Sequence, residues 1–103
     1  MAQFKSLVVT VTTAGTEVRV SSTDLWVHKV IMRPLAANTG NIFVGNNGSD
    51  VVGIGSGLHF EPADPALVIG DLEIGGKDDM FNLKNMWVDS SVNGEGISIL
   101  YFY

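Results

Sequence analysis

The stretch SLVVTVTTAGTEVRV, residues 6–20, decides the fold class of this chain. Apolar and polar residues alternate along it, so Leu7, Val9 and Val11 share one face of an extended chain, while Ser6, Thr10 and Thr12 share the other with Val8. A repeat of two is typical of a half-buried β-strand and not of a helix. Because the AGT segment interrupts the alternation, the stretch predicts two strands joined as a β-hairpin.

The same alternation recurs toward the C-terminus. The longest predicted strand runs from about residue 25 to 32 (LWVHKVIM) and ends before Pro34, which cannot donate to a ladder. Further strands are predicted at NIFVG (41–45) and ALVIGDLEI (66–74), the latter interrupted at Gly70. The segments LKNMWVDS and ISILYFY, joined by the turn SVNGEG, predict a closing hairpin.

Turns separate these strands, and helix signals are weak. In the turn ANTG (37–40), Gly40 can supply the positive φ that tight turns often need. In DDMFNLKNM (78–86), Asn82 and Asn85 disfavour a helical turn. Seven or eight short strands, with turn signals roughly every ten residues, predict an all-β fold. We expect one antiparallel β-sandwich domain over residues 1–103, jelly-roll-like, with a small barrel as the alternative.

Composition excludes several classes of protein. The chain has 103 residues with no cysteine, so disulfides and thiolate sites are impossible. Its net charge of -5 and six scattered Lys and Arg argue against binding to nucleic acid or to an anionic membrane. The N-terminal MAQFKSLVVTVTTAG resembles a strand more than a signal peptide, and no run approaches the roughly 20 apolar residues that span a bilayer.

The two histidines are the first candidates for metal or acid–base chemistry. His28 lies in the long predicted strand, on the same face as Trp26 and Val30, and His59 lies two residues before Glu61. A cupin-type metal site needs an H-x-H pair, a following Glu and a distant His, and the chain has no H-x-H pair. We therefore expect one packed histidine and one surface histidine.

The acidic residues form no recognisable site either. Asp78 and Asp79, with Asp71 and Glu73 nearby, lack the alternating ligands and closing Glu of an EF-hand loop. Nothing in the sequence selects a carboxylate pair for glycoside hydrolysis. GIGSG (53–57) lacks the following helix of a phosphate loop. We expect no catalytic, cofactor-binding or metal-binding residues, no cofactor and no enzymatic activity.

Trp26 and Trp87 allow two interpretations. They could form an aromatic platform that stacks on a sugar, as in a carbohydrate-binding module. Both lie beside aliphatic residues in predicted strands, and this context favours a place in the core.

The last predicted strand, ISILYFY (97–103), carries no charge. Ile97, Ile99, Tyr101 and Tyr103 share one face, and Leu100 and Phe102 share the other. A single sandwich has one interior and covers one face of each strand. The strand must therefore be central in a well-filled monomer or be covered by another subunit, and the sequence leaves both alternatives open.

A larger pattern carries a resemblance. NTGNIFVG is followed by a Gly-rich loop, LHFEPAD, an apolar strand with GDL, and LKNMWVDSSVNGEGISILYFY. This succession, over roughly residues 24–103, resembles small β-sandwich structural proteins of tailed bacteriophage virions, including head decoration (cement) proteins and modules of tails and fibres. One departure is Ala63, which follows Pro62 where the pattern has glycine.

The resemblance implies a function and partners. It implies a structural protein, made in the host cytoplasm, that sits on the outside of an icosahedral capsid as a homotrimer and cements major capsid protein subunits. The turns flanking NIFVG would face a neighbouring subunit or solvent. The alternative is a carbohydrate- or receptor-binding module of a phage head or tail fibre. A cupin- or glycosidase-type enzyme comes third.

Overall fold

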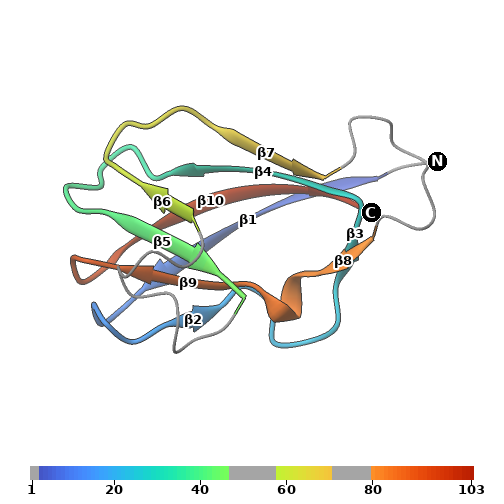
Figure 1. Ribbon diagram of the computed structural model, residues 1–103, viewed down its shortest axis with the longest axis horizontal. Helices are drawn as coiled ribbons and strands as arrows, with labels where there is room; N and C mark the ends of the chain where they lie inside the picture. Colours follow the sequence, from blue (N-terminus) through green and yellow to red (C-terminus); the bar gives the residue numbers. More distant parts are fainter. Residues whose placement is uncertain (1–2, 47–57, 71–79) are drawn as a thin grey trace.

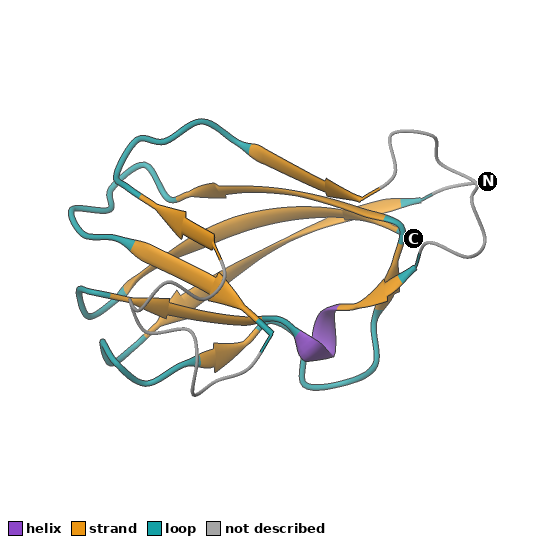
Figure 2. Cartoon of the chain, viewed as in Figure 1, coloured by secondary structure: helices purple, strands orange, loops and turns teal. Residues whose placement is uncertain are grey.

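The computed structural model describes residues 3–46, 58–70 and 80–103, and the predicted all-β class is confirmed (Figures 1 and 2). In these ranges no helix has the length and apolar character needed to cross a membrane. The elements are β1 (Phe4–Val11), β2 (Val18–Arg19), β3 (Trp26–Val27), β4 (Lys29–Pro34), β5 (Ile42–Gly45), β6 (Leu58–Phe60), β7 (Leu67–Gly70), β8 (Phe81–Asn82), the 3₁₀ turn η2 (Leu83–Asn85), β9 (Trp87–Ser90) and β10 (Glu95–Phe102).

Two four-stranded antiparallel sheets face each other. Sheet A has the order β1-β10-β4-β7, and sheet B has the order β2-β9-β5-β6. A short third sheet, sheet C, pairs β3 with β8. Alternate side chains of sheets A and B meet in one buried cluster, which makes the arrangement a sandwich. The buried cluster contains Val9, Val11, Val27, Val30, Met32, Ile42, Val44, Phe60, Leu83, Val88, Ile97, Ile99 and Tyr101.

The strand pairing is nested. β1 pairs with β10, β2 with β9, β3 with β8, β4 with β7 and β5 with β6. Two further pairings, β10 with β4 and β5 with β9, join these pairs into the sheets. As a result, most strands that follow each other in the chain lie in different sheets, and among the described strands only β5 and β6 are neighbours both in the chain and in a sheet (Figure 1).

Both predicted terminal hairpins are therefore wrong. The stretch 6–20 contributes β1 to sheet A and β2 to sheet B, and the C-terminal segment contributes β9 to sheet B and β10 to sheet A. Alternation identifies a strand that has one buried face, but it does not identify the strand's hydrogen-bonded partner. Here the connecting turns cross from one layer of the sandwich to the other.

The long predicted strand is also divided. β3 ends at Val27 and β4 begins at Lys29, so the chain leaves sheet C and enters sheet A at His28. The backbone N–H of His28 still donates to the carbonyl of Phe102, at 2.8 Å. Gly70, the last described residue of β7, lies against the His28 carbonyl with φ +110°, so no side chain fits there. Residues 71–74 of the predicted strand lie outside the described residues.

The expectation that asparagine would prevent a helical turn near residue 82 is wrong. The side-chain oxygen of Asn82 accepts hydrogen bonds from the N–H groups of Leu25 (2.9 Å) and Lys84 (3.0 Å). The second bond caps η2, a role that suits asparagine better than a place inside a helix. Asn82 thus starts the turn and fastens it to the segment before β3.

Candidate interaction surface

The outward side of sheet A carries several apolar side chains. Along β10, Ile97, Ile99 and Tyr101 are buried toward sheet B, so Leu100 and Phe102 point outward. The predicted division of ISILYFY into two faces is confirmed. Among the described residues, no third layer covers this second side of the sheet.

Strand register brings further apolar residues beside these two. Leu100 is aligned with Ile31 of β4, Ile31 with Val68 of β7, and Phe102 with Phe4 of β1. We define the apolar face as the set Phe4, Val8, Ile31, Val68, Leu100 and Phe102. Three of its members have large exposed fractions: Phe4 66%, Val8 59% and Val68 43%. Exposed apolar side chains gathered on one surface indicate an interaction site.

The charges beside the apolar face are positive. Lys29 and Arg33 alternate with Ile31 along the outward side of β4. The Lys29 ammonium lies 4.9 Å from the centre of the Phe102 ring, which is 5.9 Å from the Phe4 ring. Among the described residues of sheet A, Glu95 is the only acid, and its carboxylate is hydrogen-bonded to Thr39 and Gly40. On a chain of net charge -5, this surface is locally cationic.

The preference for tryptophans in the core is wrong. Trp26 is 52% exposed because it lies in the two-residue strand β3 of sheet C, outside the facing sheets. Trp87 is half-buried and lies on the outward side of β9, since its neighbour Val88 is in the core. The Arg19 guanidinium lies 4.5 Å from the Trp87 ring centre. The two rings belong to different sheets.

The histidines do not come together. His59 is exposed on β6 and stacks on Phe43 of β5, with ring centroids 5.2 Å apart. His28 lies between β3 and β4 and is half-buried, and its Nδ1 has no hydrogen-bond partner among the described residues. Within the part of the chain that the structure describes, no group of three His, Cys, Asp or Glu could hold a metal ion. Asp71, Glu73, Asp78, Asp79 and the segment GIGSG lie outside the described residues.

Sequence reasoning missed Asp89, which is completely buried near the end of β9. Its Oδ1 accepts hydrogen bonds from the N–H groups of Gly15 (3.0 Å) and Ser90 (2.8 Å). Its Oδ2 has no partner among the described residues. Asp89 therefore fastens the β1–β2 loop over sheet B. The sequence contains no signal for this role, because an acid at a strand end ordinarily faces solvent.

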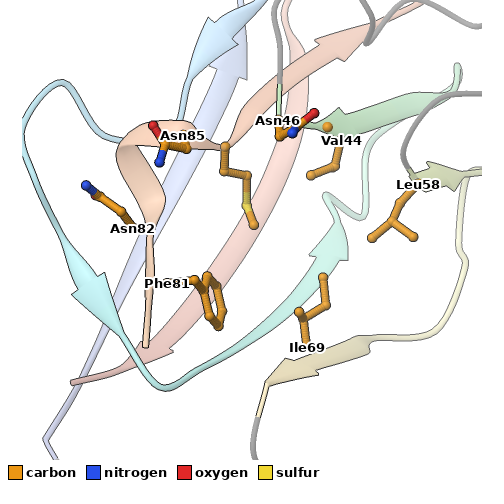
Figure 3. Close-up of a pocket in the computed structure, with 9 residues that line it drawn as sticks. Val44, Asn46, Leu58, Ile69, Phe81, Asn82 and Asn85 are labelled. Carbon is orange, nitrogen blue, oxygen red and sulfur yellow. The ribbon is translucent and has the colours of Figure 1, made fainter. Parts of the chain in front are cut away.

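A cavity of about 400 Å³ lies between the two sheets, close to β8 and η2 (Figure 3). Apolar side chains from both sheets and from β8 line it, with asparagine amides beside them. Its lining residues are Val44, Gly45, Asn46, Leu58, Ile69, Phe81, Asn82, Asn85 and Met86. None of these described side chains is a nucleophile, an acid or a base, so they offer the cavity packing surface and amide hydrogen bonds.

Comparisons with known proteins give no relative. No family model, no curated protein and no solved structure matches this chain. The apolar face and its cationic border are thus the feature of the described residues that most directly indicates a function.

Proposed function

We propose that this chain is a structural protein of a tailed bacteriophage virion that decorates the outside of the icosahedral capsid and stabilises it. The observation that carries the proposal is the apolar face of sheet A, on which Phe4 is 66% exposed. An exposed apolar surface on a small β-sandwich is suited to binding other protein subunits, and it is not suited to catalysing a reaction on a substrate. The resemblance of residues 24–103 to phage head decoration proteins supplies the biological setting.

The connectivity supports this setting. A long hairpin of nested strand pairs, rolled into two facing sheets, is how a jelly roll is built, and we infer that the fold is of this type. Jelly rolls are frequent in viral capsid proteins and in lectins, among many other classes. The fold alone does not select a function, so the proposal depends on the surface.

The proposed mechanism is bridging. A standard protein interface buries about 1,600 Å² in total, and a decoration protein repeats such a contact on several major capsid subunits. Expansion or rupture of the shell must then break all of these contacts at once. The energy barrier to rupture is therefore higher than it would be if each contact could break separately.

We also propose that the chain forms a homotrimer through part of the apolar face. A twofold contact of this face with itself would bring the cations Lys29 and Arg33 of two copies close together. In a heterologous contact, the apolar face of one copy packs against a different surface of the next copy. Repeated contacts of this kind can close into a ring of subunits. Threefold closure is what the resemblance implies, since shells present threefold axes.

Heating of particles tests the function. Virions that lack the protein should release their DNA at a lower temperature than complete virions, and adding back the purified protein should restore the higher temperature. Equal release temperatures would eliminate the cementing role. Adding back a Leu100→Asp variant, which interrupts the apolar face, should restore less of the shift.

The second candidate function is a carbohydrate- or receptor-binding module of a phage head or fibre. Exposed Trp26 favours it, because an aromatic ring open to solvent can stack on a sugar. Titration of Trp fluorescence with a panel of bacterial surface oligosaccharides tests it, with Trp26→Ala as the control. Saturable quenching that the variant loses would support the module, and an unchanged signal across the panel would count against it.

A further inference from the structure

One edge of sheet A, which pairs with no other strand in the part of the chain that the structure describes, offers backbone hydrogen-bonding groups in a regular row. β1 is the edge strand, paired on one side with β10. Gln3 and Tyr103 donate to each other's carbonyl groups at 2.8 Å, so they form a hydrogen-bonded pair. Such pairs alternate along an antiparallel ladder, so the odd-numbered residues of β1 turn their backbone groups toward β10. The even-numbered residues, among them Ser6, turn theirs toward the open edge.

The side chains at this edge are unusually apolar. Phe4 and Val8 are the two most exposed large apolar residues of the described chain, at 66% and 59%. Natural sheets ordinarily protect a long edge with charges, proline or a bulge, because an open edge pairs readily with other strands. In β1 the single charge is Lys5.

Two ammonium groups stand over aromatic rings at the same end of sheet A. Lys5 lies 5.9 Å from the centre of the Tyr103 ring, and Lys29 lies 4.9 Å from that of Phe102. Phe4 lies beside Phe102, 5.9 Å between ring centres. A strand added to β1 therefore meets backbone hydrogen-bonding groups at the edge, Phe4 on the outward side of the sheet and Lys5 on the opposite side.

We propose that β1 receives an extended, acidic and apolar segment of a partner protein as an added strand of sheet A. This inference rests on the proposed function, and the partner is then an extended segment of the capsid shell. Main-chain hydrogen bonds to the even-numbered residues would supply affinity, and alternate side chains would supply selectivity. The segment would place apolar residues beside Phe4 and Val8 and a carboxylate beside Lys5.

Charge favours this occupant over a second copy of β1. The chain has eleven acidic residues, yet none lies in β1. A second β1 would bring a second lysine to the edge and no carboxylate for either one. A strand that carries an acid opposite Lys5 meets no such repulsion, and like charges placed opposite each other destabilise a sheet.

A proline at position 6 tests the edge directly. The Ser6 N–H points away from β10, so Ser6→Pro removes an edge donor and leaves the β1–β10 ladder intact. Ser6→Thr is the matched control because it keeps the N–H. Binding of purified protein to capsid shells lacking it, measured by co-sedimentation, should weaken about tenfold in Ser6→Pro and change little in Ser6→Thr. Thermal melting checks that both variants fold, and Val8→Lys replaces Ser6→Pro if the proline variant does not fold.

A second pair of variants tests the charge. Lys5→Glu should weaken shell binding about tenfold, while Lys5→Arg should bind like the wild type. Equal binding by Ser6→Pro and Ser6→Thr would overturn the added strand and leave the decoration function standing. Failure of the wild type to bind shells would overturn both. A wild-type oligomer that Ser6→Pro dissociates, with shell binding unchanged, would show that a second copy occupies the edge and would overturn the proposed occupant.

Discussion

Thr39 donates two hydrogen bonds to the carboxylate of Glu95, one from its backbone N–H (2.6 Å) and one from its hydroxyl (2.9 Å), both to Oε2. The N–H of Gly40 donates a third, to Oε1 at 2.7 Å. Beside them, the amide of Asn38 donates to the carbonyl of Gly96 at 2.8 Å. These contacts fasten the turn between β4 and β5 to the start of β10, across both layers of the sandwich. The NTG turn is thus held within the chain, while Thr39 itself stays exposed to solvent. Contact of this turn with a neighbouring subunit stays a prediction, and residues 47–50 of the turn after NIFVG lie outside the described residues.

The Glu95 contact should make stability depend on pH. Desolvation raises the pKa of Glu95, but the hydrogen bonds from Thr39 and Gly40 lower it by more, to below its usual value of 4.5. Since the folded chain binds this proton less tightly than the unfolded chain, the contact stabilises the fold above about pH 4.5 and is lost as the pH falls through the lowered pKa. At about pH 7, Glu95→Gln should unfold at a lower urea concentration than the wild type. The difference between the two midpoint concentrations should shrink as the pH falls toward about 3. A difference that stays constant with pH would contradict this assignment.

Ala63 should be a site of backbone strain. It adopts φ +65°, a left-handed conformation that costs a residue with a Cβ about 1–2 kcal/mol. It lies in a turn closed by a hydrogen bond from the N–H of Asp64 to the carbonyl of Glu61, at 3.2 Å. Ala63→Gly relieves this strain but also increases the conformational entropy of the unfolded chain, which opposes the gain. The net effect should be a rise of up to about 1 kcal/mol in the free energy of unfolding. The matched control is Ala66→Gly, which has no such strain to relieve and should destabilise the fold. Thermal melting of both variants provides the measurement.

Neighbouring residues of β10 should respond differently to truncation. Ile99 is 1% exposed and lies in the buried cluster, so Ile99→Ala should cost about 2–5 kcal/mol of unfolding free energy. Leu100 is half-buried on the apolar face, and Leu100→Ala should cost the isolated chain clearly less. Urea unfolding at low protein concentration compares the two. Equal losses would mean that the outward side of sheet A is already covered in the free protein.

Association should depend on the apolar face. Light scattering of the wild type should give a mass near three times the 11.0 kDa chain, and Leu100→Asp or Phe102→Asp should lower it toward the monomer while the fold persists. Lys84→Asp, outside the apolar face, is the control and should keep the wild-type mass. A wild type that remains monomeric at high concentration would refute self-association in solution and leave any trimer to form on the capsid.

Several features of the fold were predictable because they depend on local pattern. Alternation along 6–11 and 97–102 predicts strands, and it assigns Leu100 and Phe102 to the side opposite Ile97 and Ile99, as the structure shows. The positive φ at Gly70 is a conformation that glycine adopts readily. Ala63 stands where the phage-protein pattern has glycine, and its φ of 65° is a conformation that glycine favours. The expected positive φ at Gly40 is wrong. Glycine is needed at this position for a different reason: the side chains of Ser91 and Val92 leave no room for a Cβ.

Local alternation was enough to locate most of the strands and their apolar faces, because a period of two is a property of each strand alone. Tertiary structure decided which strands pair, so both terminal hairpins were mispredicted while the strands themselves were present. Tertiary structure also decided that Trp26 is exposed and that Asp89 is buried. The exposure of each side chain depends on which layer or loop covers it, and the β1–β2 loop covers Asp89. Local pattern carries no information about covering elements distant in the chain. The apolar face was predictable from β10, but its cationic border and its free β1 edge arise only where β1, β4 and β10 lie side by side.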